Sequence, residues 1–284
     1  MMSRPTHVQS GFTLIEMVMV MVITGIIAGI VAIFLKSPID GYIASARRAE
    51  MTDIADTALR RIGRDVHAAL PNSVRVSGSC NGTATCFVEF IPSLTGGRYR
   101  SAPASVAPTG DLLDFTAADS SFDAFVPLAS AGIAAGNTIV VYNLGDAAGI
   151  SAYLGNNTAT VAAAPVAAAN ANETRITLTA PTLFPSASPA ARFQVITTPV
   201  SYACDPVAGT ITRWWGYSIQ AAQPTATPGG ASTALLASHV SNCLFAYNAN
   251  VVAQRNGLMT MQLSVTESGE TIALYSATHV TNVP

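Results

Sequence analysis

The segment Gly11-Phe12-Thr13-Leu14-Ile15-Glu16 opens an apolar stretch of nineteen residues, 17–35, that contains no charged side chain. As a helix, such a stretch rises about 28 Å, which is enough to cross the hydrocarbon core of a bilayer. A carboxylate at the entrance of a membrane helix is energetically costly, so Glu16 needs a partner or a function. The segment therefore predicts a membrane helix with a functional acid at its head.

Three other interpretations of this segment compete with that one. A cleaved signal peptide has an apolar core of about 7–15 residues that ends near a small-residue cleavage site. The sequence Ala44-Ser45-Ala46 has suitable residues, but Pro38 separates it from Leu35, and the apolar core is too long. A buried helix of a soluble protein is disfavoured by the same length and apolarity. A plain single-pass anchor stays open, because hydropathy alone does not distinguish it.

Charged side chains are scarce and unevenly distributed. They make up 11% of the chain, against about 25% in ordinary soluble proteins. Residues 36–75 hold 12 of them in 40 positions, whereas residues 76–284 hold 16 in 209 positions. The second region has six arginines, ten acids and no lysine, and so a net charge of about −4. A nucleic-acid-binding face needs clustered cations, so no nucleic-acid partner is expected.

The four cysteines fall into two neighbourhoods, Cys80 with Cys86 and Cys204 with Cys243. Neither pair has the spacing of a zinc site. Three disulfide pairings are possible, and we favour the local one, in which the two loops gain about 2 and about 4 kcal/mol in the chain-entropy model. Four unpaired buried thiols are the alternative. Because disulfides persist in oxidising compartments, this pairing would place the body of the protein in the periplasm or beyond.

The cations around the apolar stretch favour the opposite orientation in the membrane. Lys36, Arg47 and Arg48 follow it, whereas Arg4 and the amino terminus precede it. A count of positive charges would therefore leave the body in the cytoplasm. We give the cysteines more weight than this count.

The helical pattern breaks after Leu35, at Pro38 and Gly41. A proline inside a helix removes one backbone hydrogen bond, so we expect a kink here. From Tyr42 to Leu70 a helical period returns, and Asp56–Arg60 and Arg61–Asp65 have the spacing of i,i+4 ion pairs. Pro71 should end the helix. The chain thus divides into an apolar helix over 12–35, an amphipathic helix over 36–71 and a head over 72–284.

The head is expected to be antiparallel and rich in β-strands, which makes the fold class α+β. The clearest alternation runs from Met259 to Val265, and residues 267–270 should turn it into a second strand over 271–280. Residues 205–209 should turn another hairpin, with Cys243 on a neighbouring strand over 240–247. The low-complexity stretch 156–172 is expected to be an exposed loop. Further short strands are predicted over 86–91, 138–142, 175–178 and 193–202.

No catalytic motif occurs in the sequence, so no enzymatic activity is expected. Three isolated histidines, His67, His239 and His279, are more often structural. Four aspartates lie close together, but their spacing does not match a calcium-binding loop, and we interpret them as turn residues: Asp111, Asp114, Asp119 and Asp123. One of the adjacent Trp214 and Trp215 should be buried and the other exposed. No cofactor or metal is expected.

The leader of residues 1–11, the Gly11-Phe12 junction and Glu16 together resemble the class III signal of type IV prepilins and type II secretion pseudopilins. This resemblance implies that a prepilin peptidase of the inner membrane cuts between Gly11 and Phe12 and methylates the new amino group of Phe12. It also implies that the Phe12 ammonium of one subunit neutralises Glu16 of its neighbour in the filament core.

The same resemblance implies a type IV pilin-like fold and a set of partners. The chain would be a single-pass protein of the bacterial inner membrane with a periplasmic head, and later part of a pilus or pseudopilus. Its expected partners are inner-membrane lipid before assembly, other minor and major pilin-like subunits through the N-terminal helix, and the inner-membrane assembly platform.

Scattered matches beyond the signal resemble the MSHA pilus biogenesis prepilins of the MshO type. They imply a minor pilin that initiates or caps an MSHA-like pilus. A J-type minor pseudopilin of a type II secretion system and a membrane-anchored surface adhesin stay open as alternatives. The matching segments are Gly41-Tyr42, Arg47-Arg48-Ala49-Glu50, Ala58-Leu59-Arg60-Arg61, 70–76 and 279–284.

Overall fold

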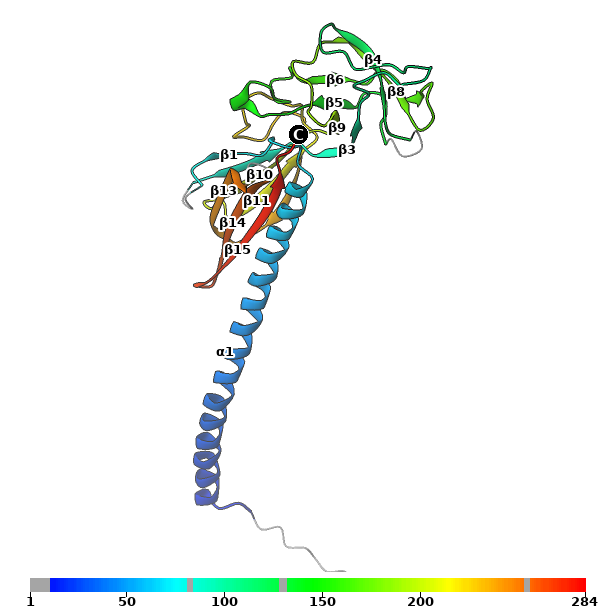
Figure 1. The fold of residues 1–284 in the computed structure, drawn as a ribbon. Coiled ribbons are helices and arrows are strands. Elements are labelled where there is room, and N and C mark those ends of the chain that lie inside the picture. The colour runs from blue at the N-terminus through cyan, green and yellow to red at the C-terminus, as the bar shows by residue number, and fades with distance from the viewer. Residues whose placement is uncertain (1–10, 81–83, 128–131, 253–255) are drawn as a thin grey trace, which may run out of the picture. The chain divides into compact units, whose positions relative to one another are not determined.

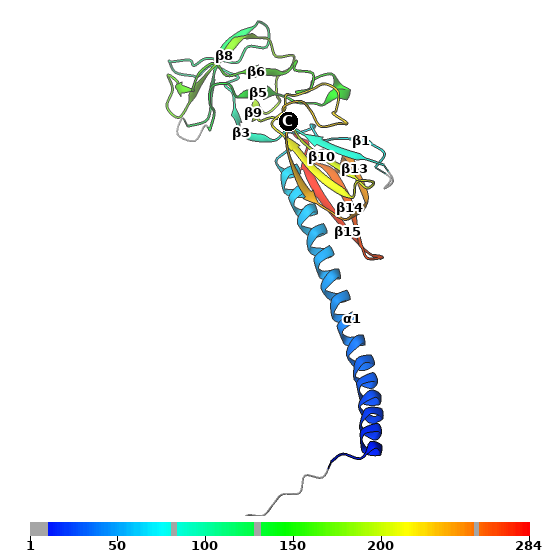
Figure 2. The ribbon, with the colours of Figure 1, turned by 180° about the vertical axis from the view of Figure 1, so that it is seen from behind.

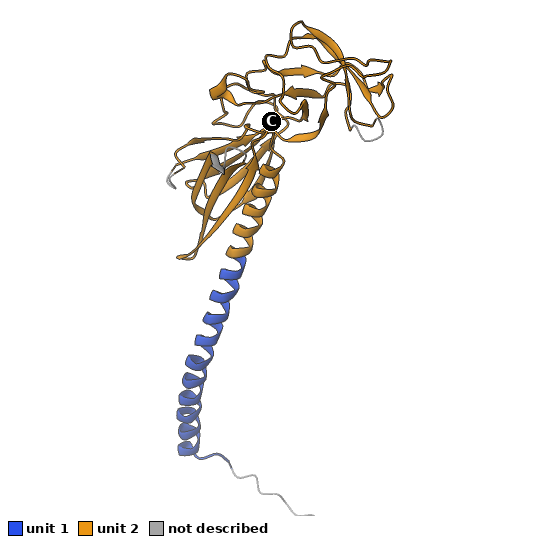
Figure 3. Ribbon diagram, in the orientation of Figure 1, with its two compact units in different colours: residues 1–50 blue, residues 51–284 orange. Residues whose placement is uncertain are grey.

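The computed structural model describes residues 11–80, 84–127, 132–252 and 256–284. The chain forms two compact units, residues 1–50 and residues 51–284 (Figure 3). Residues 1–10 of the expected leader lie outside the described part of the chain. The fold is α+β, with one long apolar N-terminal helix followed by an antiparallel β-rich head, as predicted.

The long helix α1 (Leu14–His67) extends through both units (Figure 1). It continues through Pro38 and Gly41, so the helix does not end where the sequence pattern breaks. The kink expected at Pro38 stays a prediction. The helix ends at His67 rather than at Pro71, and Arg64 and His67 in its last turn lie at the negative end of the helix dipole.

The amphipathic period predicted for the second part of α1 is present from Met51 onward, whereas residues 42, 43 and 46, where it was expected to begin, are exposed. Its buried residues recur every three or four positions, and they are Met51, Ala55, Ala58, Leu59, Ile62, Gly63 and Val66. Gly63 allows a close approach of α1 to β15 (Glu270–Thr281), because a Cβ there would lie 3.0 Å from the hydroxyl oxygen of Thr278. The predicted ion pairs Arg60–Asp56 and Arg61–Asp65 are both present, with N–O distances of 2.7 and 3.1 Å.

Two antiparallel sheets share one apolar core with this part of α1 (Figures 1 and 2). The three-stranded sheet has the order β13 (Val240–Val252), β14 (Asn256–Glu267) and β15 (Glu270–Thr281). The hairpins β14–β15 and β10–β11 follow the predicted turns. The five-stranded sheet has the order β1 (Arg75–Gly78), β2 (Cys86–Phe90), β10 (Val200–Asp205), β11 (Thr210–Trp215) and β12 (Ser232–Ala237).

A second apolar core lies between the remaining strands. Phe122 and Phe193 pack edge to face in it, with 5.7 Å between ring centroids. One sheet has the order β3 (Ser93–Arg98), β9 (Arg192–Ile196), β5 (Thr138–Val141) and β6 (Thr158–Thr160). The other has the order β4 (Asp119–Ala124), β8 (Thr174–Thr182) and β7 (Val166–Ala167), and a short 3-10 helix, η2 (Asp146–Ala148), lies between β5 and β6 in sequence.

Two of the strand and loop predictions are wrong. The single strand expected over 193–202 is divided into β9 and β10, which belong to different sheets. Pro199 lies in the connection and has no N–H to donate to a ladder, so it separates the two strands. The stretch 156–172 is not simply an exposed loop, because it contains β6 and β7, and its Asn157 is buried.

The structure contains the disulfides Cys80–Cys86 and Cys204–Cys243. The second one joins β10 to β13. The sequence analysis placed Cys243 on a strand next to the β10–β11 hairpin, but β10 and β13 lie in different sheets and do not pair. It therefore closes the five-stranded sheet onto the three-stranded sheet. The sequence signal could not show this, because spacing along the chain says nothing of which sheet a strand joins.

Asp65 connects the helix to the five-stranded sheet. Its Oδ2 accepts hydrogen bonds from the hydroxyl of Tyr202, at 2.7 Å, and from Nε of Arg213, at 3.0 Å. Burial, together with the neighbouring Asp65, raises the pKa of Tyr202, so the hydroxyl keeps its proton and stays a donor. Hydrogen bonds to a charged acceptor are among the stronger ones, so this contact fixes α1 on β10 and β11.

A buried carboxylate, Glu89, organises the side of the head where β1 and β2 pair. It is fully buried, and it accepts from Nε of Arg75 at 2.6 Å and from the hydroxyl of Tyr217 at 2.9 Å. Arg75 also donates to the carbonyls of Gln220 and Ala221, and its guanidinium lies 3.5 Å from the centroid of the Tyr153 ring. Burial raises the pKa of the Glu89 carboxyl, against the opposing effect of Arg75.

We expect Glu89→Leu to destabilise the head by about 3 kcal/mol, because it leaves Arg75 and Tyr217 without their buried acceptor. Unfolding of the detergent-solubilised chain, followed by the fluorescence of the two tryptophans on β11, measures this. The control is Asp56→Ala, which breaks a solvent-exposed ion pair and should leave the unfolding free energy unchanged. Equal effects of both variants would contradict the role of Glu89.

The raised pKa of Glu89 also predicts a pH dependence. In the unfolded chain the pKa of this carboxyl is about 4.3. The folded state has the higher pKa and therefore keeps the proton to a higher pH. Its contribution to stability is therefore full below about pH 4.3 and is lost as the pH rises through the folded pKa. The free energy of unfolding of wild type minus that of Glu89→Gln should fall over this window. A difference that grows with pH would show instead that Arg75 dominates the environment.

Candidate functional site

The residues Gly11, Phe12 and Thr13 precede the helix without regular secondary structure. Among the residues that the structure describes, nothing lies within 4 Å of the position that a Cβ of Gly11 would take, and the Phe12 side chain is 79% exposed. No residue from 12 onward, in the described ranges, thus covers the peptide bond between Gly11 and Phe12. Such a bond is suited to proteolysis, because exposed segments without regular secondary structure are the preferred sites of cleavage.

Thr13 and Glu16 form a reciprocal cap at the start of α1. The backbone N–H of Glu16 donates to the hydroxyl oxygen of Thr13 at 3.3 Å, and the backbone N–H of Thr13 donates to Oε2 of Glu16 at 3.4 Å. The Thr13 hydroxyl donates to the same carboxylate oxygen at 3.3 Å. This is a capping box, in which the carboxylate also faces the positive end of the helix dipole.

The capping box reveals a role for Thr13 that the sequence analysis missed. The signal was present, because Thr13-Leu14-Ile15-Glu16 has the T-x-x-E spacing that precedes an apolar run. The carboxylate of Glu16 is therefore partly satisfied inside its own subunit. The carboxylate could also accept from a second, external cation, since the two hydrogen bonds from Thr13 leave acceptor capacity on it.

The first part of α1 has the length and apolar composition to cross a membrane, and its most apolar window has none of its residues buried within the chain. The apolar side chains that follow Glu16 are all exposed, from Met17 to Leu35. A continuous apolar surface of this size has to be covered by lipid or by another protein. The structure thus places the carboxylate of Glu16 at one end of a surface that needs a partner.

The other residues predicted for the site lie elsewhere. Pro38 and Gly41 lie further along the same helix, and the four cysteines belong to the head. The four aspartates are divided among different roles. Asp123 is buried and pairs with Arg175 at 2.9 Å, and Asp114 accepts from Thr116. Among the described residues, no group of three or more His, Cys, Asp or Glu side chains could hold a metal ion.

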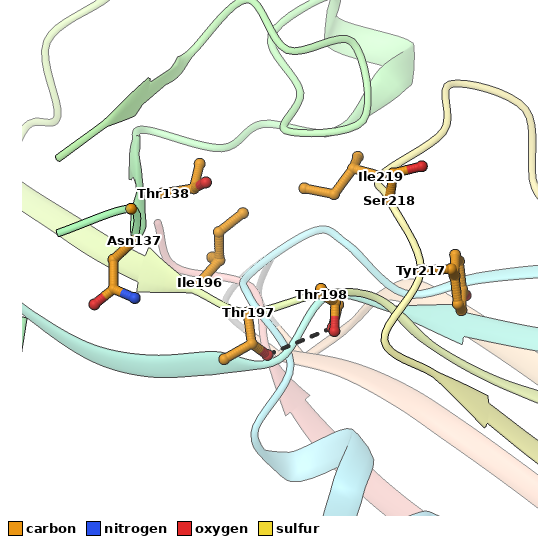
Figure 4. A pocket seen from close by; sticks show the side chains of 9 residues that line it. Asn137, Thr138, Ile196, Thr197, Thr198, Tyr217, Ser218 and Ile219 are labelled. Carbon is orange, nitrogen blue, oxygen red and sulfur yellow. Dashed lines mark hydrogen bonds between the residues drawn. The ribbon is translucent and has the colours of Figure 1, made fainter. Parts of the chain in front are cut away.

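A pocket of about 490 Å³ lies in the head, where the chain leaves β9 and where it follows β11 (Figure 4). Its side chains are hydroxyls, one amide and two isoleucines, and the Thr197 hydroxyl donates to the carbonyl of Thr198. Tyr217 lines it, but its hydroxyl is engaged by Ser201 and Glu89. This lining supplies neither a paired base and nucleophile nor a pair of carboxylates, so it does not assemble a catalytic group.

Trp214 is buried, but Trp215 is half-buried and packs against the first core, so the expectation that one of the two is exposed is wrong. Trp214 packs on Phe87 with 5.9 Å between ring centroids, and Arg213 lies over the Trp215 ring at 4.9 Å. Both rings therefore have structural partners.

Residues 6–32 match a protein-family model described as the prokaryotic N-terminal methylation motif. The match covers the Gly11-Phe12 junction, Thr13, Glu16 and most of the apolar stretch. No curated protein and no solved structure matches the chain. The matched motif implies processing by a prepilin peptidase and assembly with other pilin-like subunits, and it indicates the type IV pilin and pseudopilin family.

Proposed function

We propose that this chain is a minor pilin-like subunit that helps to initiate or cap an MSHA-like type IV pilus. The observation that carries the proposal is the N-terminal site, where an accessible Gly11-Phe12 bond precedes a capped carboxylate and an uncovered apolar helix. The size of the head over 72–284 favours a minor component, because the major subunits of the filaments that the N-terminal signal resembles are usually shorter than 284 residues.

The sequence of events follows from the chemistry of the site. The helix enters the inner membrane with Glu16 held by its own cap, and the peptidase then cuts after Gly11 and methylates Phe12. The new ammonium is a second charge at the N-terminus, and it becomes costly once the subunit packs into an apolar filament core. In the filament, this ammonium on one subunit pairs with Glu16 on its neighbour, which neutralises both charges and sets the axial stagger.

A J-type minor pseudopilin is the second candidate, since it would use the same N-terminal site and a head of similar size. A deletion of the gene separates the two. Loss of surface pili, counted by electron microscopy, supports the pilus assignment. Normal pili combined with loss of secreted hydrolases supports the pseudopilin, and normal pili with lost attachment supports an anchored adhesin.

We expect Gly11→Val to prevent cleavage, because a branched side chain would obstruct the peptidase at a position that is open in the structure. Mass spectrometry should then find the eleven N-terminal residues retained, whereas the wild-type protein should begin with methylated Phe12. Gly25→Ala is the control, because it lies within the helix and also has open space around it. Cleavage of Gly11→Val at the wild-type level would contradict the assigned site.

Glu16→Gln separates the two roles of the carboxylate. Glutamine keeps the capping box with Thr13 but carries no charge, whereas Glu16→Ala removes both. If the ammonium of a neighbour pairs with Glu16, both variants should be processed normally and yet be depleted from sheared filaments, since loss of a buried ion-pair partner costs about 3–5 kcal/mol.

The control for this experiment is Thr13→Val, which removes the hydroxyl and keeps the charge. It should enter filaments better than Glu16→Gln. Incorporation of Glu16→Gln at the wild-type level would show that the acid serves only as a helix cap.

A further inference from the structure

The four cysteines of the head lie close together, although they form two separate disulfides. Cys86 and Cys204 are register partners in the antiparallel pairing of β2 with β10. Each of them is bonded to a further cysteine, Cys86 to Cys80 and Cys204 to Cys243. The two disulfides are therefore adjacent across one pair of strands.

The side chains of Cys86 and Cys204 lie on the same face of their sheet, since both are fully buried in the first core. Register partners in an antiparallel pair have Cα atoms about 4.5 or about 5.5 Å apart. A disulfide needs Cα atoms about 4.4–6.8 Å apart. The bonded pair Cys204 and Cys243 has a Cα separation of 6.5 Å. By backbone spacing, Cys86 is thus no worse placed than Cys243 to form a bond with Cys204.

Solvent reaches this cluster at Cys80. This residue is partly exposed and follows the exposed Gly78 and Ser79, whereas the other three cysteines are at most 1% exposed. Gly78 is the register partner of Cys86 on β1, and β2 lies between β1 and β10 in the sheet. Cys80 therefore follows a strand on the side of β2 that is away from Cys204. An external thiol would meet the Cys80–Cys86 bond first.

We propose that this cluster is a site of thiol–disulfide exchange, at which a dithiol moves the link between two sheets into a single sheet. One thiolate of the dithiol attacks the sulfur of Cys80, and Cys86 leaves as a thiolate. The second thiol of the dithiol then displaces Cys80, and the dithiol becomes a disulfide. The Cys86 thiolate attacks the sulfur of Cys204, which forms the Cys86–Cys204 bond and releases Cys243 as a thiolate.

The electrons and protons of this sequence balance. The dithiol loses two electrons, and the protein changes from two disulfides to one disulfide and two thiols. The two protons of the dithiol end on Cys80 and Cys243. The partner has to carry two neighbouring thiols, because a single thiol would remain on Cys80 as a mixed disulfide.

The exchange changes which parts of the head are cross-linked. The Cys204–Cys243 bond joins the five-stranded sheet to the three-stranded sheet, whereas Cys86 and Cys204 both belong to the five-stranded sheet. After the exchange, β10 and β13 are no longer cross-linked, although the protein still contains one buried disulfide. A dithiol acting at the surface thus releases one sheet from the other inside the core.

The wild-type chain in detergent tests this, with dithiothreitol as the probe. After limited treatment, N-ethylmaleimide blocks the thiols in denaturant at mildly acidic pH, where thiolates are scarce and further exchange is slow. Mass spectrometry of the peptides should find Cys86 linked to Cys204, with Cys80 and Cys243 blocked. Blocked Cys80 and Cys86 beside an intact Cys204–Cys243 bond would overturn the proposal. Complete reduction that never passes through the Cys86–Cys204 species would also overturn it.

Two variants that lose the same disulfide give a matched comparison without any added dithiol. Cys80→Ser leaves a free thiol on Cys86, opposite Cys204, whereas Cys86→Ser leaves the free thiol on Cys80, beyond β2. Part of the Cys80→Ser protein should contain the Cys86–Cys204 bond and a free Cys243. Cys86→Ser should keep the Cys204–Cys243 bond. An intact Cys204–Cys243 bond throughout both variants would overturn the exchange, and if neither variant folds, the wild-type result decides. None of these outcomes depends on pilus assembly.

Discussion

An ionised carboxylate at the mouth of an apolar helix has to be compensated, and much of the N-terminal design follows from that constraint. Glu16 obtains part of this compensation from Thr13 and from the first turn of α1. A helix N-terminus carries a partial positive charge, so the acid is placed at the more favourable end of the helix. Because the cap is local, it exists in a lone subunit as well as in an assembly.

The same helix also meets a second requirement, since its later turns form part of the core of the head. The change occurs without a break in helical assignment, through a change in side chains alone. Before residue 36 apolar residues occupy every face, whereas from Met51 onward they occupy one stripe and charges occupy the rest. Asp65 then connects that stripe to the sheet through Tyr202 and Arg213.

The sequence was sufficient for the features that depend on local pattern. The amphipathic stripe of α1 from Met51 onward and the β14–β15 hairpin follow from periodicity, and the structure has them. The prediction over 193–202 failed because an apolar run does not reveal where a chain crosses from one sheet to another. Residues Thr197 to Pro199 make that crossing, and Pro199 was the available indication.

Long-range partners lay beyond such reasoning. Nothing near Glu89 in the sequence indicates that Arg75 and Tyr217 will converge on it, because the three residues come from β1, β2 and the segment after β11. The opposition of Cys86 and Cys204 is likewise a matter of strand register between residues far apart in the sequence. The N-terminal site could be predicted from the sequence for the opposite reason, since all its residues lie within a few positions of one another.

The inter-sheet disulfide has a mechanical consequence. The later turns of α1 contact side chains from both the five-stranded and the three-stranded sheet, and the Cys204–Cys243 disulfide cross-links those two sheets. A tensile load applied along the helix is then shared by two sheets that cannot slide apart at that point. Pulling the helix out of the head would then require many contacts to break at once instead of one after another. The disulfide therefore raises the force needed to separate the helix from the head.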